Sequence, residues 1–148
     1  VDTGHPDLAL ELAGDDVGRL SRLAGLLARR EDEATRAEAV RERLFELLSA
    51  RAAEPDAAGH TLAALAGMLA ERDREDEAVA LYQRALTLEY GHIGWRLALA
   101  RLLAQNGDAA GAIHQARICL RLSPQHAGAT RLIEELSTSD MGVHPDQP

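Results

Sequence analysis

The chain has 148 residues and a net charge of −8, and all 16 of its basic residues are arginines. A chain this acidic gains no counterion release on a phosphate backbone, which excludes nucleic acid as the main partner, and no stretch of about 18 apolar residues is present to insert into a membrane. Hydrophobic residues make up 46% of the sequence but aromatics only 3%, and because Ala and Leu recur at helical spacing we expect an all-α fold.

The first predicted elements form a pair of helices at about residues 15–52. Asp15 or Asp16 is placed to cap the first helix, and the residues from Glu31 to Thr35 break the pattern before the second. The apolar stripes of the two helices are Leu20, Leu23, Ala24 and Leu27, then Ala37, Val40, Leu44, Leu47 and Leu48. We interpret the pair as a degenerate first repeat, joined to the rest by a loose connection that contains Pro55.

Two copies of one pattern follow, at residues 59–92 and 93–126. Subtracting Leu65 from Leu99 gives 34, and the same difference separates Ala66 from Ala100, Leu69 from Leu103, Ala78 from Ala112 and Leu86 from Leu120. A fixed period of this size is typical of stacked helix-turn-helix units. Small residues at the matching positions predict close crossings between the two helices of each unit.

The second copy resembles the tetratricopeptide repeat. The residues that carry the resemblance are Trp95, Leu99, Ala100, Leu103, Gly107, Asp108, Ala112, Ile113, Leu120 and Pro124. The first copy departs from the pattern, with Asp73 and Tyr90 where Gly and Pro are usual, and the second has Ala116 and Cys119 in place of an aromatic residue and an alanine. The resemblance implies antiparallel helix pairs stacked into a short right-handed solenoid that binds proteins.

After Pro124 the stripe Ala129, Leu132, Ile133 and Leu136 predicts one more helix, at residues 125–137. The resemblance implies that this helix closes the array. We predict a single helical repeat domain over residues 1–138, followed by a disordered tail at 139–148. Because the chain begins at Val1, we expect it to be a piece of a longer bacterial protein. Its compartment stays open: cytoplasmic or, if the parent protein is exported, periplasmic.

The sequence offers no pattern typical of catalysis, so we expect a protein that is not an enzyme and has no cofactor or metal. The six histidines lack the mutual spacing or Cys partners of a zinc site. The carboxylates from Glu71 to Glu77 fall in a turn between helices, where Asp73 and Asp76 are placed to cap and favour the next helix start. Cys119 takes the position of Ala85 and is expected to be a buried small residue.

The candidate site is the concave groove lined by the first helix of each unit. Counting from the packed stripes places small residues and arginines on the opposite stripe: Arg22, Arg29, His60, Ala63, Gly67, Leu97, Arg101, Gln105 and Arg131. We hypothesise that this groove binds an acidic peptide or protein segment, with its carboxylates on Arg29, Arg101 or Arg131 and an apolar side chain on Leu97. The alternative is that these arginines only pair with neighbouring acids.

The sequence is compatible with two other modes of interaction. In one, the array is a structural spacer that joins other domains of a longer protein. In the other, it self-associates into a homo-oligomer through the leucine-rich first helices, including Leu26, and the face around Phe45. Some tetratricopeptide repeats bind a chaperone's C-terminal carboxylate with Lys, Arg and Asn side chains. This chain has no Lys and its one Asn, Asn106, lies at a turn, so that specific partner is disfavoured. We expect Trp95 to serve packing rather than recognition.

Overall fold

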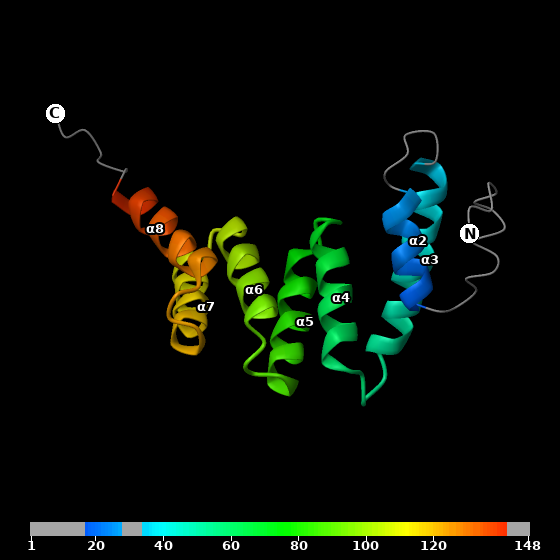
Figure 1. The fold of residues 1–148 in the computed structure, drawn as a ribbon, viewed down its shortest axis with the longest axis horizontal. Helices are drawn as coiled ribbons and strands as arrows, with labels where there is room; N and C mark the ends of the chain where they lie inside the picture. The colour runs from blue at the N-terminus through cyan, green and yellow to red at the C-terminus, as the bar shows by residue number, and fades with distance from the viewer. Residues whose placement is uncertain (1–16, 28–33, 142–148) are drawn as a thin grey trace. The chain divides into compact units, whose positions relative to one another are not determined.

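The protein is represented by a computed structural model that describes residues 17–27 and 34–141 (Figure 1). All regular structure in these ranges is α-helical, and the helices are α2 (Val17–Leu27), α3 (Ala34–Ala52), α4 (Gly59–Ala70), α5 (Glu75–Leu88), α6 (Ile93–Gln105), α7 (Ala109–Leu122) and α8 (Ala127–Met141). The chain divides into an N-terminal unit, residues 1–57, and a C-terminal unit, residues 58–148. The division falls within the connection that the sequence predicts to be loose.

The N-terminal unit contains one helix pair, in which α2 packs along α3. Its core consists of Leu20, Ala24, Ala37 and Val40, with Leu23 and Leu47 packed at the edge. These residues recur every three or four positions, so each helix presents one apolar stripe to the other. The expected pair at residues 15–52 is therefore present where the structure describes it, while its proposed caps at Asp15 or Asp16 and the residue Arg29 lie outside the described ranges.

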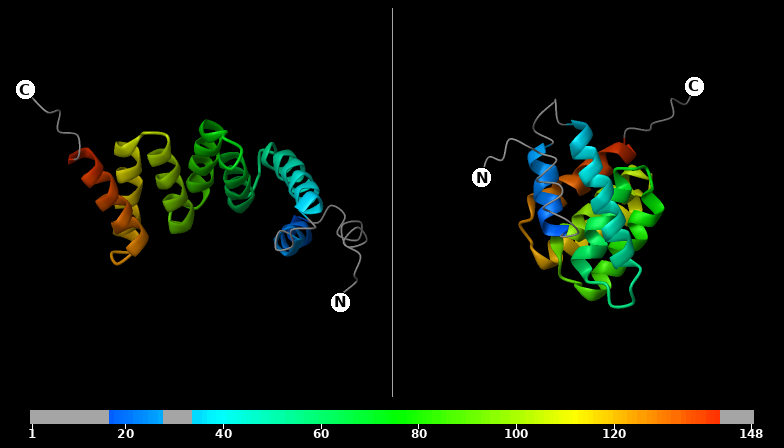
Figure 2. Two further views of the ribbon diagram at one scale, coloured as in Figure 1. Left: turned by 90° about the horizontal axis from the view of Figure 1, so that it is seen from above. Right: turned by 90° about the vertical axis from the view of Figure 1, so that its right-hand side faces the viewer.

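The C-terminal unit contains two antiparallel helix pairs and one further helix. α4 packs on α5 and α6 on α7, while α5 also contacts α6 and α8 packs mainly on α7 (Figure 2). Residues at matching repeat positions are buried alike: Ala66 and Ala100 are both 0% exposed, and so are Ala78 and Ala112. Each alanine lets two helices approach closely, since a larger side chain would hold them apart. The predicted period of 34 is therefore a repeat in three dimensions.

The turn inside each pair adopts a left-handed backbone at one matching position. Gly107 has φ 83° at the end of α6, and Asp73 has φ 58° one repeat earlier. Asp108 then caps α7, because its carboxylate accepts a hydrogen bond from the Gly111 N–H at 2.8 Å. The expected cap from Asp73 is wrong: the residue preceding α5 is Arg74, which makes no side-chain cap. The aspartate of the first copy occupies the glycine position of the second, one residue too early to cap.

Histidine side chains cap the first turns of two helices, a role that was not predicted from the sequence. His92 Nδ1 accepts a hydrogen bond from the Trp95 N–H at 3.2 Å at the start of α6. His126 Nδ1 accepts one from the Ala129 N–H at the same distance at the start of α8. These residues are one repeat apart, and a glycine, Gly94 or Gly128, lies two residues after each. A Cβ at either glycine would approach the imidazole Cε1 to 3.3 or 3.2 Å.

Trp95 is half-buried and packs within the C-terminal unit, as expected. Its ring stacks on His92, and a Cβ at Gly59 would lie only 3.0 Å from it. The glycine that begins α4 therefore makes room for the indole of α6. α8 begins at Ala127 and ends at Met141, past the end predicted at Ser137, so residues 139–141 are helical where a tail was expected. Residues 142–148 lie outside the described ranges.

Candidate partner-binding cleft

A cleft of 510 Å³ lies between α6 and α8 in the C-terminal unit. Its walls come from one stripe of each helix, since the lining positions on both helices are three or four residues apart. The lining residues are Arg101, Ala104 and Gln105 of α6 and Gly128, Arg131, Leu132, Glu135, Leu136 and Ser139 of α8. Both helices also pack on α7, and the cleft lies between the two lining stripes.

The cleft carries positive charge on an acidic protein. Arg101 and Arg131 are both exposed, and neither guanidinium has a hydrogen bond or ion pair within residues 17–27 and 34–141. One carboxylate, Glu135, lies on the same lining. Two arginines against one glutamate leave a local excess of one positive charge, whereas the whole chain carries −8. A guanidinium with all its N–H groups free can bind a carboxylate through two parallel hydrogen bonds.

The floor of the cleft is apolar and rests on the core. Leu132 is buried and Leu136 half-buried, and both belong to the cluster in which Leu97, Ala100, Ala116, Cys119 and Ala129 are packed. Gly128 allows α8 to approach α6, because a Cβ there would lie 3.0 Å from Leu97 Cδ2. The positions of the two arginines are therefore set by rigid helices packed on a common core.

The predicted groove residues divide into those that the cleft brings together and those that it does not. Arg101, Gln105 and Arg131 line it together. Leu97 does not: it is only 8% exposed and packs inside the core. The reason is α8, which covers the stripe of α6 that would otherwise face solvent. An apolar contact for a partner comes instead from Leu132 and Leu136.

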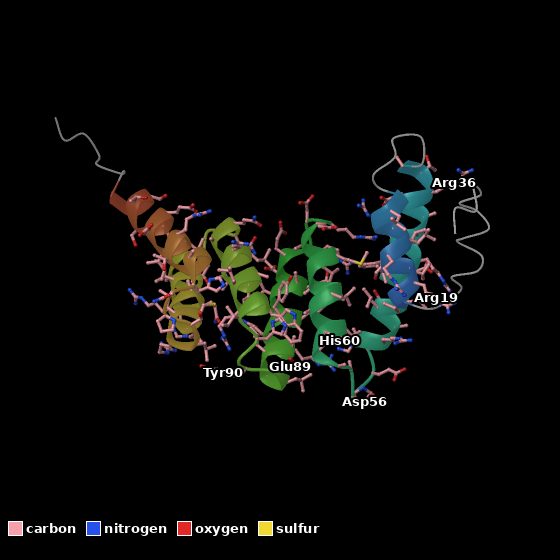
Figure 3. All side chains as sticks on the ribbon, viewed as in Figure 1. Arg19, Arg36, Asp56, His60, Glu89 and Tyr90 are labelled. Carbon is pink, nitrogen blue, oxygen red and sulfur yellow. The ribbon has the colours of Figure 1, made fainter. Side chains whose placement is uncertain are left out.

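The remaining predicted residues lie elsewhere. On α4, His60 is exposed and Ala63 is buried, and a Cβ at Gly67 would lie 3.6 Å from the hydroxyl of Tyr82 on α5. Arg22 lies on α2 in the N-terminal unit, where its Nε donates to the Gly18 carbonyl at 3.3 Å. In Figure 3, His60 lies at the same end of the C-terminal unit as Glu89 and Tyr90.

Sequence reasoning missed the contribution of α8 beyond Arg131. Gly128, Glu135 and Ser139 line the cleft beside the leucines. Gly128 lies three residues before Arg131, Glu135 four residues after it, and Ser139 four residues after Glu135. This spacing is the signal that could have found them, because it continues a single helical stripe. From the sequence, only Arg131 of this helix is assigned to the groove, because the resemblance implies a closing helix that packs through one face.

The acidic turn before α5 is a solvated surface feature. Arg74 Nε and Nη2 donate to the two carboxylate oxygens of Glu77, each at 2.7 Å. This hydrogen-bonded pairing lowers the pKa of Glu77 and raises the pKa of Arg74. The hollow beside it, 440 Å³, is lined by Asp73, Arg74, Glu75, Asp76, Glu77 and Asn106. A glutamate held ionised by an arginine is poorly suited to donate or take up protons near neutral pH.

Within residues 17–27 and 34–141 no three His, Cys, Asp or Glu side chains cluster as metal ligands would. None of the helices in those ranges has the length and apolar character that crossing a membrane requires.

Comparison with known proteins identifies the fold. No family model and no curated protein sequence matches the chain. Two crystal structures of MamA superpose with TM-scores of 0.68 and 0.67 at 15% identity; the matches cover 92% of this chain and 75% and 70% of the MamA chains. The crystal structure of the APC/C hetero-tetramer Cut9–Hcn1 matches with a TM-score of 0.63 at 18% identity, over 88% of this chain and 25% of the other. The chain therefore has the all-α tetratricopeptide-repeat-like fold, with its helices packed in consecutive antiparallel pairs.

Proposed function

We propose that this protein is a non-catalytic interaction module that binds an acidic segment of a partner protein in the cleft between α6 and α8. The observation that carries the proposal is the pair of arginines, Arg101 and Arg131, which lack partners among the described residues and flank an apolar floor. The Cut9–Hcn1 hetero-tetramer, in which a chain of similar fold assembles with another protein, supports a protein as the partner.

The cleft suits a short peptide segment in size and chemistry. Its volume of 510 Å³ lies within the usual range of about 300 to 1,000 Å³ for binding sites. A carboxylate on either arginine forms charge-assisted hydrogen bonds, and an apolar side chain beside it would cover Leu132 and Leu136. Gln105 and Ser139 add neutral hydrogen-bonding groups at the rim. An acidic segment with interspersed leucines would contact the arginines, the leucine floor and the polar rim at once.

The test is a titration with fluorescein-labelled peptides. A peptide of alternating Glu and Leu should bind, and the same peptide with Gln for Glu should bind about tenfold or more weakly, because the charge-assisted contacts are lost. Arg101→Glu and Arg131→Glu should each weaken binding of the acidic peptide by a similar factor. Arg117→Glu is the matched control, since Arg117 is exposed on α7 and does not line the cleft.

Added salt should weaken the wild-type complex, because both arginines are exposed. Equal affinity for the Glu and Gln peptides would refute recognition of carboxylates. Equal losses in Arg101→Glu, Arg131→Glu and Arg117→Glu would place the effect on net charge and not on the cleft.

A second candidate is self-association, favoured by two leucines at one repeat position. Leu88 and Leu122 are the last residues of α5 and α7, and they are 57% and 42% exposed. Sedimentation of the wild type beside the double variant Leu88→Gln/Leu122→Gln measures this directly. A dimer that dissociates in the double variant would support an assembly role through this surface, whereas a wild-type monomer would exclude it.

A further inference from the structure

One buried position of the repeat changes character between the two copies. Leu62 of α4 is 0% exposed, and the residue one repeat later is Arg96 of α6, which is only 4% exposed. On the partner helices, the half-buried Leu81 of α5 is matched by the half-buried Gln115 of α7. A leucine pair in the first copy is therefore an arginine and a glutamine in the second. A buried arginine costs folding free energy unless other groups compensate it, so this exchange calls for a reason.

The contacts of Arg96 hold its guanidinium in place without neutralising it. Nη1 donates to Gln115 Oε1 at 2.8 Å, and Nη2 donates to the Tyr90 carbonyl at 2.6 Å. The guanidinium carbon lies 4.4 Å from the centroid of the Tyr90 ring. Nε is buried and has no hydrogen-bond partner among the described residues. Every one of these partners is a neutral group.

Arg96 lines a pocket of 280 Å³, here named the Arg96 pocket, between α5, α6 and α7. The other lining residues are Gln83, Leu86, Thr87, Tyr90, Leu99 and Gln115. No acidic residue is among them, so the pocket is positive on a chain whose net charge is −8. Tyr90, which lies where the tetratricopeptide pattern has proline, is 59% exposed and belongs to the turn between α5 and α6 (labelled in Figure 3). Three departures from the repeat, Tyr90, Arg96 and Gln115, therefore meet at one pocket.

We propose that the Arg96 pocket binds a single carboxylate group, of the kind carried by an aspartate or glutamate side chain or by a small organic acid. An arginine has five N–H donors and Arg96 uses two in the described contacts, so donors remain for an anion. A water molecule could accept one of these hydrogen bonds but would leave the positive charge uncompensated. The volume of 280 Å³ fits one side chain and is below the usual range for drug-sized ligands.

This site is independent of the cleft between α6 and α8, with which it shares no lining residue. The test uses the ¹⁵N-labelled chain and follows the Nε–H signal of Arg96 by NMR. Titration with N-acetyl-glutamate N-methylamide should shift this signal saturably, with a Kd on the order of 1 mM for one isolated group. The glutamine analogue should leave it unmoved. Equal shifts with both compounds, or no shift with either, would overturn the proposal.

A second arm identifies the source of the carboxylate. Succinate tests the small organic acid, and a short glutamate-containing peptide tests a protein side chain. Tighter binding of the peptide assigns the pocket to a protein partner, and tighter binding of succinate assigns it to a metabolite acid; both support recognition of a carboxylate. Arg101→Glu, which alters the cleft between α6 and α8, should leave the Arg96 signal and its response to the glutamate derivative unchanged. The Arg96 pocket and the cleft can therefore be refuted separately.

Two variants keep the proposal testable without loss of the fold. Arg96→Leu/Gln115→Leu gives the second copy the leucines that the first copy has at these two positions, Leu62 and Leu81, so it should retain the helical circular dichroism of the wild type. Because the Arg96 signal is absent from this variant, its binding is followed through the backbone amide of Thr87, which should no longer respond to the glutamate derivative. A response equal to that of the wild type would overturn the proposal.

Gln83→Glu places a carboxylate on the lining itself, while Gln125→Glu adds the same charge at an exposed position away from the pocket. Only Gln83→Glu should lower the affinity for the glutamate derivative, by at least tenfold. Its melting temperature should also exceed that of the Gln125→Glu control. Undiminished binding by Gln83→Glu would contradict a carboxylate site.

Discussion

The imidazole of His92 lies flat against the indole of Trp95, with ring centroids 3.7 Å apart and ring planes within 7°. The same histidine accepts the hydrogen bond from the Trp95 N–H. One side chain therefore both caps α6 and holds the only tryptophan in its packing position. The start of α6 and its contact with Gly59 of α4 are coupled through this pair.

Removing the His92 side chain should weaken both the start of α6 and the packing of Trp95 against Gly59. His92→Ala is expected to lower the free energy of unfolding by about 1 kcal/mol and to change the Trp95 fluorescence, because the stacked ring and the cap are lost together. His92→Asn keeps an acceptor for the helix start and should retain most of the stability while still changing the fluorescence. Urea unfolding followed by fluorescence and by circular dichroism measures the two effects. Equal stabilities of the Ala and Asn variants would contradict a capping role.

The left-handed residues of the two turns predict opposite outcomes for matched substitutions. Asp73→Gly should stabilise the C-terminal unit by roughly 0.5 to 1 kcal/mol, because Gly adopts φ 58° without the steric penalty of a Cβ. Gly107→Ala should destabilise it by about 1 kcal/mol for the same reason. Thermal unfolding measures both changes. A shift of the same sign in the two variants would show that backbone conformation does not control these turns.

Tyr82 should make stability depend on alkaline pH. Burial, and secondarily the charge of Glu71, raises the pKa of Tyr82 above its ordinary value of 10.0. The unfolded chain therefore loses this proton first, so the contribution is fully present below about pH 10 and is lost as pH rises through the folded-state pKa. Urea unfolding at a series of alkaline pH values should show the decline, and Tyr82→Phe should make it shallower. An unchanged slope in that variant would exclude Tyr82 as its source.

Cys119 should report the opening of the C-terminal core. Its side chain is 0% exposed, and burial raises the pKa of the thiol, an effect that the nearby charge of Arg96 only partly opposes. Labelling by Ellman's reagent should be slow in the folded protein and fast in urea, where the thiol is accessible. Rapid labelling of the folded chain would mean that α6, α7 and α8 do not form a stable core around it.

The repeat could be predicted because its information is periodic. The matching burial of Ala66 and Ala100 follows from spacing alone, since a stripe that recurs every three or four residues has to face a neighbouring helix. Spacing does not say which neighbour covers a second stripe. Leu97 was expected on an open surface because nothing in its own helix indicates that α8 packs over it.

The lining of the cleft between α6 and α8 could be predicted in part, again from helical spacing. Arg101, Gln105 and Arg131 could be placed on one surface because each lies on a stripe opposite the packed one. Arg96 could not be recognised as a buried residue, because an arginine in a sequence predicts a solvent-exposed position. Only the contacts to Tyr90 and Gln115 show that a charged side chain occupies a core position. A polar group in a core depends on partners from other segments of the chain. Those partners do not recur at a regular spacing in the sequence, so helical periodicity does not reveal them.

The paired histidine caps fix where each ring keeps its hydrogen. Because Nδ1 of His92 and of His126 accepts from the backbone, the neutral ring must be the Nε2–H tautomer in both. The first turns of α6 and α8 thus share one chemical requirement, an imidazole whose Nδ1 lone pair faces the backbone and whose single hydrogen lies on the opposite side of the ring.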